Sequence, residues 1–185
     1  MNRILKVQKK DLISSFYNYA AGYYEAGIDL IDILLNENRY SDLPKPFRKE
    51  YILLEEECKI YPIMFLFRQY IELIVKALYL QFDIKEEYNN QEINVFTKHS
   101  LQKIWPPLKI KLENIEKDND DDFGDIVPIL DETIKWFSSV DDDSCSFRFP
   151  TNRKLQLYHN DEENYDLSEI KYLVTEFDDL IHYFI

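Results

Sequence analysis

The chain has 185 residues, enough for one domain with a sizeable core. Its 35 acidic and 22 basic residues give a net charge of −13, which argues against broad electrostatic binding of nucleic acid but not against a small basic pocket. Two cysteines are too few for a disulfide framework, and the N-terminus lacks the apolar run of a signal peptide. These features predict a cytoplasmic protein.

The first predicted helix covers residues 11–38. Its apolar residues alternate spacings of four and three, which makes a continuous seam suited to packing against an antiparallel neighbour. Gly22 and Gly27 weaken its middle, because each costs up to about 1 kcal/mol relative to alanine. Two nearby prolines predict a loop over residues 39–47, and a short helix or ordered lead-in follows over residues 48–59.

The most apolar stretch covers residues 61–81 and predicts a buried helix, with Pro62 in its first turn. Arg68, Glu72 and Lys76 recur at every fourth position, so they form one narrow charged stripe on this helix. Because an unpaired buried charge is costly, the stripe must be paired internally, matched by other segments, or open to a cleft. Its charges also argue against a membrane span.

The middle of the chain predicts a polar connector and a third helix. Residues 83–97 form the connector, and the helix begins over residues 99–105. Pro106-Pro107 is expected to stop or kink this helix, which then continues over residues 108–115. The acidic run at residues 118–122 does not fit a calcium loop, because the required glycine and glutamate are missing from the sixth and twelfth positions. The run predicts a solvated turn.

Two more amphipathic helices are predicted towards the C-terminus. Between them, residues 146–164 alternate apolar and polar side chains in short pieces, which indicates a small hairpin. Asp166 and Glu169 resemble a capping box that opens the last helix. We therefore expect a single all-α domain over residues 1–185, an antiparallel bundle of four to six helices with a small irregular or hairpin insert near residues 147–160.

The charged stripe is the first candidate for chemistry. It is either a buried ion-pair ladder or an anion site in which Glu72 orients Arg68 towards a phosphate. His99 is the second candidate. It stands at a predicted helix start, where it either caps and packs or titrates near neutral pH.

Two further candidates lie in the predicted insert. Arg148 stands between two phenylalanines, and it either stacks on these rings at the surface or, as we expect, points inward to a carboxylate such as Glu72. Arg153 and His159 have five residues between them, a spacing that many proteins contain by chance.

The helix FLFRQYIELIVKALYL, the segment KHSLQKIW, the acidic linker and helix after it, and the run FRFP together resemble a branch of the HEPN proteins over residues 12–184. Members of this family are cytoplasmic helical bundles from bacterial toxin–antitoxin, phage-defence and nucleotide-binding settings, and they are usually homodimers. Many are metal-independent ribonucleases, in which an arginine stabilises the scissile phosphate and a histidine, separated from it by four to six residues, acts as acid or base.

The resemblance implies two alternative sites. Arg153 and His159 fit the spacing of the nuclease motif, although their surroundings alternate like a strand and the next predicted helix starts only after Asp166. In the other alternative, the arginines hold phosphate, the glutamate orients one of them and the histidine moves a proton. The residues of this second, catalytic pocket are Arg68, Glu72, His99 and Arg148.

The resemblance further implies binding roles for Lys76, Arg153 and His159, with no metal or other cofactor. The implied partners are RNA or a nucleotide, an antitoxin or defence protein, and a second copy of the chain. One alternative function is a non-catalytic acidic module that binds a protein partner, and the charge of −13 favours it. Another is a helical structural domain with a satisfied polar core.

Overall fold

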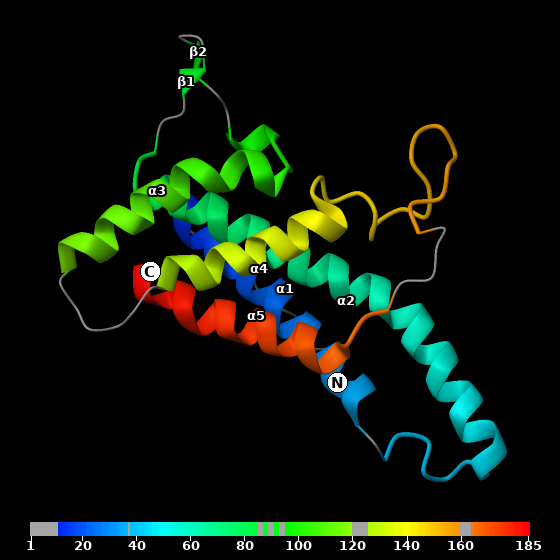
Figure 1. The fold of residues 1–185 in the computed structure, drawn as a ribbon. Helices are drawn as coiled ribbons and strands as arrows, with labels where there is room; N and C mark the ends of the chain where they lie inside the picture. Colours follow the sequence, from blue (N-terminus) through cyan, green and yellow to red (C-terminus); the bar gives the residue numbers. More distant parts are fainter. Residues whose placement is uncertain are drawn as a thin grey trace, which may run out of the picture.

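The protein is represented by a computed structural model. The residues that this structure describes are 11–36, 38–84, 87–88, 91–92, 95–119, 126–159 and 164–185. Within them, five α-helices form the expected all-α bundle, and the insert near residues 147–160 is irregular, as predicted (Figure 1). The helices are α1 (Leu12–Leu35), α2 (Lys45–Gln81), α3 (Leu101–Asn119), α4 (Ile126–Asp141) and α5 (Leu167–Ile181).

Short elements complete the described structure. Two-residue strands β1 (Glu87–Tyr88) and β2 (Gln91–Glu92) pair antiparallel in the connector between α2 and α3. A 3-10 turn, Val95–Thr97, precedes α3, and another, His182–Phe184, follows α5. The acidic run at residues 118–122 lies largely outside the described residues, so the turn predicted there stays a prediction.

Helices α1 and α2 form an antiparallel hairpin. The Asp11 carboxylate accepts from the Ser14 N–H at 2.9 Å and caps the start of α1. Gly27 is buried against the ring of Phe67, and a Cβ at this position would collide with that ring. A glycine that lowers helix propensity therefore permits the close approach of two helices. Gly22, in contrast, faces open space.

Helix α2 is longer than predicted, because residues 48–59 are its beginning and not a separate element. Pro62 consequently lies in the helix interior, so the prediction of a first-turn proline was wrong. Both Pro62 and Cys58 are exposed, which lets water bond the Cys58 carbonyl that lacks its usual N–H partner. The buried residues that follow Pro62 hold the rest of the helix in place by tertiary packing.

Helix α3 continues through Pro106-Pro107, so these prolines do not stop it. Apolar residues of α3 at helical spacing are buried before and after the prolines, and Pro106 itself is exposed. The Trp105 indole N–H donates to the Asp131 carboxylate of α4 at 2.8 Å, which joins the two helices beside the proline pair. Tertiary packing here overrides the local preference of the residue before a proline.

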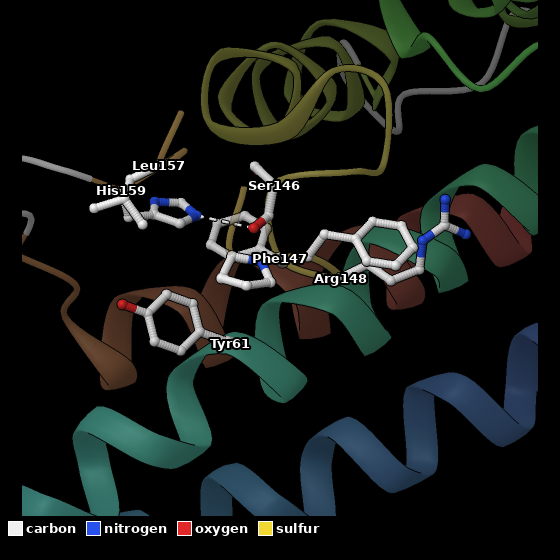
Figure 2. A pocket seen from close by; sticks show the side chains of 8 residues that line it. Tyr61, Ser146, Phe147, Arg148, Leu157 and His159 are labelled. Atoms are coloured by element: carbon white, nitrogen blue, oxygen red, sulfur yellow. Dashed lines mark hydrogen bonds between the residues drawn. The ribbon is translucent and has the colours of Figure 1, made fainter. Parts of the chain in front are cut away.

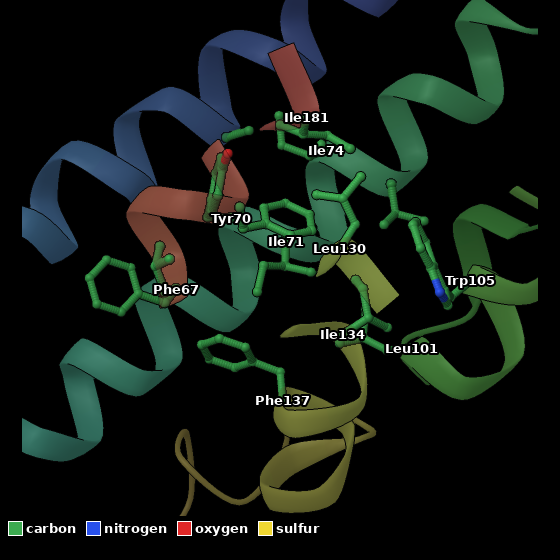
Figure 3. Close-up of a cluster of buried hydrophobic side chains, with 14 of the residues drawn as sticks. Phe67, Tyr70, Ile71, Ile74, Leu101, Trp105, Leu130, Ile134, Phe137 and Ile181 are labelled. Carbon is green, nitrogen blue, oxygen red and sulfur yellow. The ribbon is translucent and has the colours of Figure 1, made fainter. Parts of the chain in front are cut away.

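One hydrophobic core joins all five described α-helices, and Figure 3 shows part of it. The Asp166 carboxylate accepts from the N–H groups of Ser168 and Glu169 and caps α5, as the sequence predicted. No helix in the described part of the chain is both long enough and apolar enough to span a bilayer. Residues labelled in the view of the core are Phe67, Tyr70, Ile71, Ile74, Leu101, Trp105, Leu130, Ile134, Phe137 and Ile181.

Candidate functional site

The charged stripe of α2 forms a buried clamp, which we define as Arg68, Glu72 and Lys76 together with His99. The Glu72 carboxylate accepts from Arg68 Nη1 at 3.1 Å and from Lys76 Nζ at 2.6 Å. His99 Nδ1 lies 2.9 Å from the same carboxylate, although the imidazole is 58% exposed. The stripe is therefore paired within its own helix and is also matched by a residue from the start of α3.

Arg68 additionally binds main-chain carbonyls at two helix ends. Its Nε donates to the Asp141 carbonyl at 2.8 Å, and its Nη2 donates to the carbonyls of Asp142, at 2.6 Å, and His99. The guanidinium thus joins the end of α4 to the start of α3, and it supplies a donor to the carbonyl of Asp141, the last residue of α4. Burial lowers the pKa of Arg68, and the nearby Glu72 carboxylate opposes this shift.

Arg68 is completely buried and its donors are committed, so it offers no surface to a phosphate in this arrangement. Asp142 completes the junction: its carboxylate accepts from the Gln102 N–H at 3.0 Å and from the Ser100 hydroxyl at 2.5 Å. The cluster therefore holds three helices together, α2, the end of α4 and the start of α3, and we call it a structural tie. The proposed phosphate-holding role of Arg68 requires an opening of this tie.

Arg148 does not join the clamp, and the expectation that it points inward to Glu72 was wrong. Its guanidinium is at the surface, with the carbon Cζ 4.9 Å from the centre of the Phe149 ring. The physical reason is that Arg68, Lys76 and His99 already occupy the Glu72 carboxylate. A cation–π contact at the surface leaves the charge of Arg148 in water.

Arg148 instead lines a second feature, which we call the aromatic pocket. This cavity of about 380 Å³ opens between α2 and the insert (Figure 2). Its wall combines three aromatic rings with one guanidinium and one imidazole. Its lining residues are Tyr61, Ser146, Phe147, Arg148, Phe149, Pro150, Leu157 and His159.

His159 is held firmly at one side of the aromatic pocket. Its ring stacks on Phe147 with a centroid distance of 5.1 Å and an interplanar angle of 25°, and it lies 5.4 Å from the ring of Tyr61. Its Nε2 donates to the Ser146 carbonyl at 3.1 Å, which selects the tautomer protonated at Nε2. Figure 2 shows the Arg148 guanidinium at the other side, away from this histidine.

Arg153 does not line the pocket with His159. It is exposed in a turn that the isolated bridge between Thr151 and Leu157 closes, which confirms the predicted hairpin. Neither Arg153 nor His159 lies on a helix, since α5 begins only at Leu167. The helical setting of the nuclease motif is therefore missing from this pair.

Asp141 connects the clamp to the aromatic pocket. Its carbonyl accepts from Arg68, and its carboxylate Oδ1 accepts from the N–H groups of Cys145, at 2.9 Å, and Ser146, at 3.0 Å. The Ser146 carbonyl in turn accepts from His159. Through this chain of hydrogen bonds, the buried Arg68 is placed to position the turn that carries the pocket.

Sequence reasoning missed the pocket because it assigned Arg148 to Glu72 and not to His159. Arg148 and His159 line the same cavity only because the hairpin returns the chain. The contribution of Tyr61 could have been found, since it stands four and seven residues before Phe65 and Arg68 on the same stripe of α2.

No protein-family model matches this chain, and searches of the curated proteins and of the solved structures find no similar one. In the described part of the chain, no three His, Cys, Asp or Glu residues lie together in a way that could hold a metal ion.

Proposed function

We propose that this HEPN-like protein binds a nucleotide, or the end of an RNA strand, in the aromatic pocket. The observation that carries the proposal is the meeting of three aromatic rings, Arg148 and His159 around one cavity of about 380 Å³. Aromatic faces stack on bases of any sequence, and a guanidinium binds phosphate oxygens in a bidentate manner. A cavity near the lower end of the range for small-molecule sites, roughly 300–1,000 Å³, suits a single nucleotide unit.

The charge of the chain limits this binding to the pocket. At a net charge of −13, the protein as a whole repels a phosphate backbone, so only a local cation can hold one. Arg148 is the basic residue among those that line the pocket. With one phosphate neutralised on a single strand, the logarithm of the affinity should fall against the logarithm of salt with a slope of about −0.7.

Cleavage of RNA without metal, as in the resembled family, would require Arg148 and His159 in this protein. Arg68 is enclosed by the clamp, whereas Arg148 and His159 are both among the residues that line the cavity. Arg148 would stabilise the charge on the phosphate, and His159 would transfer the proton. We therefore place the proposed site in the insert and assign a positioning role to the clamp.

The test is calorimetric titration with AMP, UMP and a 5′-phosphorylated tetraribonucleotide. Arg148→Ala and Phe149→Ala should each weaken binding about tenfold, because one removes the phosphate ligand and the other removes a stacking face. Lys111→Ala is the charge-matched control, since Lys111 is exposed on α3 and outside the pocket, and it should bind as the parent does. Equal binding by all three variants would refute the site.

Incubation of RNA in EDTA distinguishes binding alone from cleavage and compares the two histidines. His159→Ala and Arg148→Ala should abolish any cleavage, whereas His99→Ala should retain it. Loss of cleavage in His99→Ala with retention in His159→Ala would return the active site to the clamp. Loss in Arg153→Ala with retention in Arg148→Ala would favour the nuclease motif that the sequence spacing suggests.

A further inference from the structure

The first half of α2 carries an uncovered apolar surface, which we call the open seam. Its members follow one another at spacings of four, three, four and three residues and are all exposed. The exposed fractions of its aromatic and leucine residues range from 41% to 56%. The open seam consists of Phe47, Tyr51, Leu54, Cys58 and Tyr61.

Alternating spacings of three and four are the pattern of a helix that packs against another helix. Figure 1 shows the beginning of α2, in cyan, extending past the ends of the other helices of the bundle. The ring of Tyr40, from the preceding loop, lies 5.9 Å from that of Tyr51 and shields only one member of the seam. About four turns of this helix, with the spacing of a helix–helix interface, therefore have no helical neighbour among the residues that the structure describes.

The exposed charged side chains beside the open seam that have no ion-pair partner among the described residues are acidic. Glu50 and Glu57 follow one edge of it, and both are exposed with no hydrogen bond or ion pair to any described residue. On the other edge, Arg48 donates to the carbonyls of the loop before α2, and Lys59 pairs with Glu55. The remaining basic residues of this segment lie nearly opposite the seam on the helix.

A second copy of this chain fits the open seam poorly. An antiparallel pair of seams would place Glu50 of each copy beside Glu57 of the other, and a parallel pair would place Glu50 beside Glu55. Both arrangements bring like charges together, and each copy also carries a net charge of −13. The charges therefore favour a different, basic partner.

We propose that the open seam binds one amphipathic helix of a partner protein. That helix carries apolar residues at alternating spacings of three and four, and lysine or arginine beside them. Its apolar residues cover the seam, and its basic residues pair with Glu50 and Glu57. The proposal is independent of the nucleotide proposal, although Tyr61 belongs to both surfaces.

The test uses two synthetic peptides of 21 residues with leucine at the interface positions. One carries lysine at the flanking positions and the other carries glutamate, and each is titrated into the full chain by calorimetry. The lysine peptide should bind with an affinity that falls as salt rises, and the glutamate peptide should not bind. Leu54→Asp should weaken binding of the lysine peptide at least tenfold, because it places a charge in the centre of the interface.

A charge exchange makes the test specific. Glu50→Lys combined with Glu57→Lys should weaken binding of the lysine peptide about tenfold and permit binding of the glutamate peptide. Glu25→Lys combined with Glu132→Lys changes the net charge equally at exposed positions of α1 and α4 and should leave both affinities unchanged. Unfolding curves establish that all variants are folded.

Three results would overturn the proposal. One is equal binding of the two peptides by the parent protein, and another is no binding of either. The third is a dimer in light scattering that Leu54→Asp converts to a monomer, since a second copy would then be the occupant of the seam.

Discussion

The two halves of α2 invert the usual relation between residue type and burial. One stripe of this helix contains the open seam and, further along, the charged residues of the clamp. In the first half the leucine of the stripe, Leu54, is 56% exposed, whereas in the second half Lys76 is 4% exposed. This difference shows that residue spacing alone determines which side chains share a face of a helix. Whether that face is buried depends on which other elements pack against it.

The covered half tolerates charge because its partners come from helix ends. Arg68 meets two carbonyls at the end of α4 and one at the start of α3, and Glu72 is bonded by three cationic or imidazole groups. A buried charged group whose hydrogen bonds are all formed adds little net stability relative to an apolar core. Removal of one member of such a cluster, however, leaves its buried partners without a hydrogen bond or a counter-charge, which is costly. The clamp should therefore be sensitive to truncation.

The largest expected effect is that of Arg68→Ala. It removes the buried ion pair with Glu72 and the guanidinium donors of the Asp141 and His99 carbonyls, whereas the Asp142 carbonyl keeps its bond from the Leu101 N–H. The free energy of unfolding should therefore fall by about 3–5 kcal/mol. Urea unfolding followed by circular dichroism measures this loss. A decrease below about 1 kcal/mol would mean that water replaces the guanidinium easily, and the clamp would then not be what ties the three helices.

A matched pair of leucines compares the two halves directly. Leu78→Ala should cost about 2–5 kcal/mol, because Leu78 is fully buried and the truncation leaves a cavity. Leu54→Ala should change stability by at most about 0.5 kcal/mol, because its side chain is half exposed already. Equal losses in urea unfolding would show that the open seam is covered in solution, either by this chain or by another copy.

The smallest expected effect concerns pH and a second carboxylate held by lysines, Asp131 of α4. Burial by itself raises the pKa of Asp131, but hydrogen bonds from Lys109, Lys135 and Trp105 outweigh it and lower the pKa to about 2. Because the folded pKa lies below the ordinary value of 3.8, this stabilisation is present above pH 4 and disappears as the pH falls through 2.

Urea unfolding of the parent protein and of Asp131→Asn between pH 5 and pH 2 measures this contribution. The difference in stability between the two proteins should shrink as the pH falls, because protonated aspartic acid and asparagine are both neutral. A constant difference would mean that the lysines do not stabilise the carboxylate form of Asp131.

The helices could be predicted wherever the apolar periodicity was strong. The predicted boundaries were wrong where a proline was given too much weight. Pro62 was expected in a first turn and lies in the interior of α2. Pro106-Pro107 was expected to stop or kink α3, and the helix runs through this pair into the predicted continuation because buried residues follow at helical spacing. The meeting of Glu72 with His99 was anticipated, since both were placed in one pocket. That Arg148 and His159 would line one cavity was not anticipated, because it depends on a hairpin closed by a single bridge.

The sequence by itself determined the helical class, the buried second half of α2, its charged stripe and the irregular insert, because periodicity and turn residues act over a few neighbouring positions. Only the tertiary structure decided that main-chain carbonyls would satisfy Arg68 and that Arg148 would stay at the surface. It also decided that no other described helix would cover the open seam. The reason is that carbonyls are present at every residue and carry no sequence signal. Which of them reach a buried guanidinium depends on how distant helix ends pack.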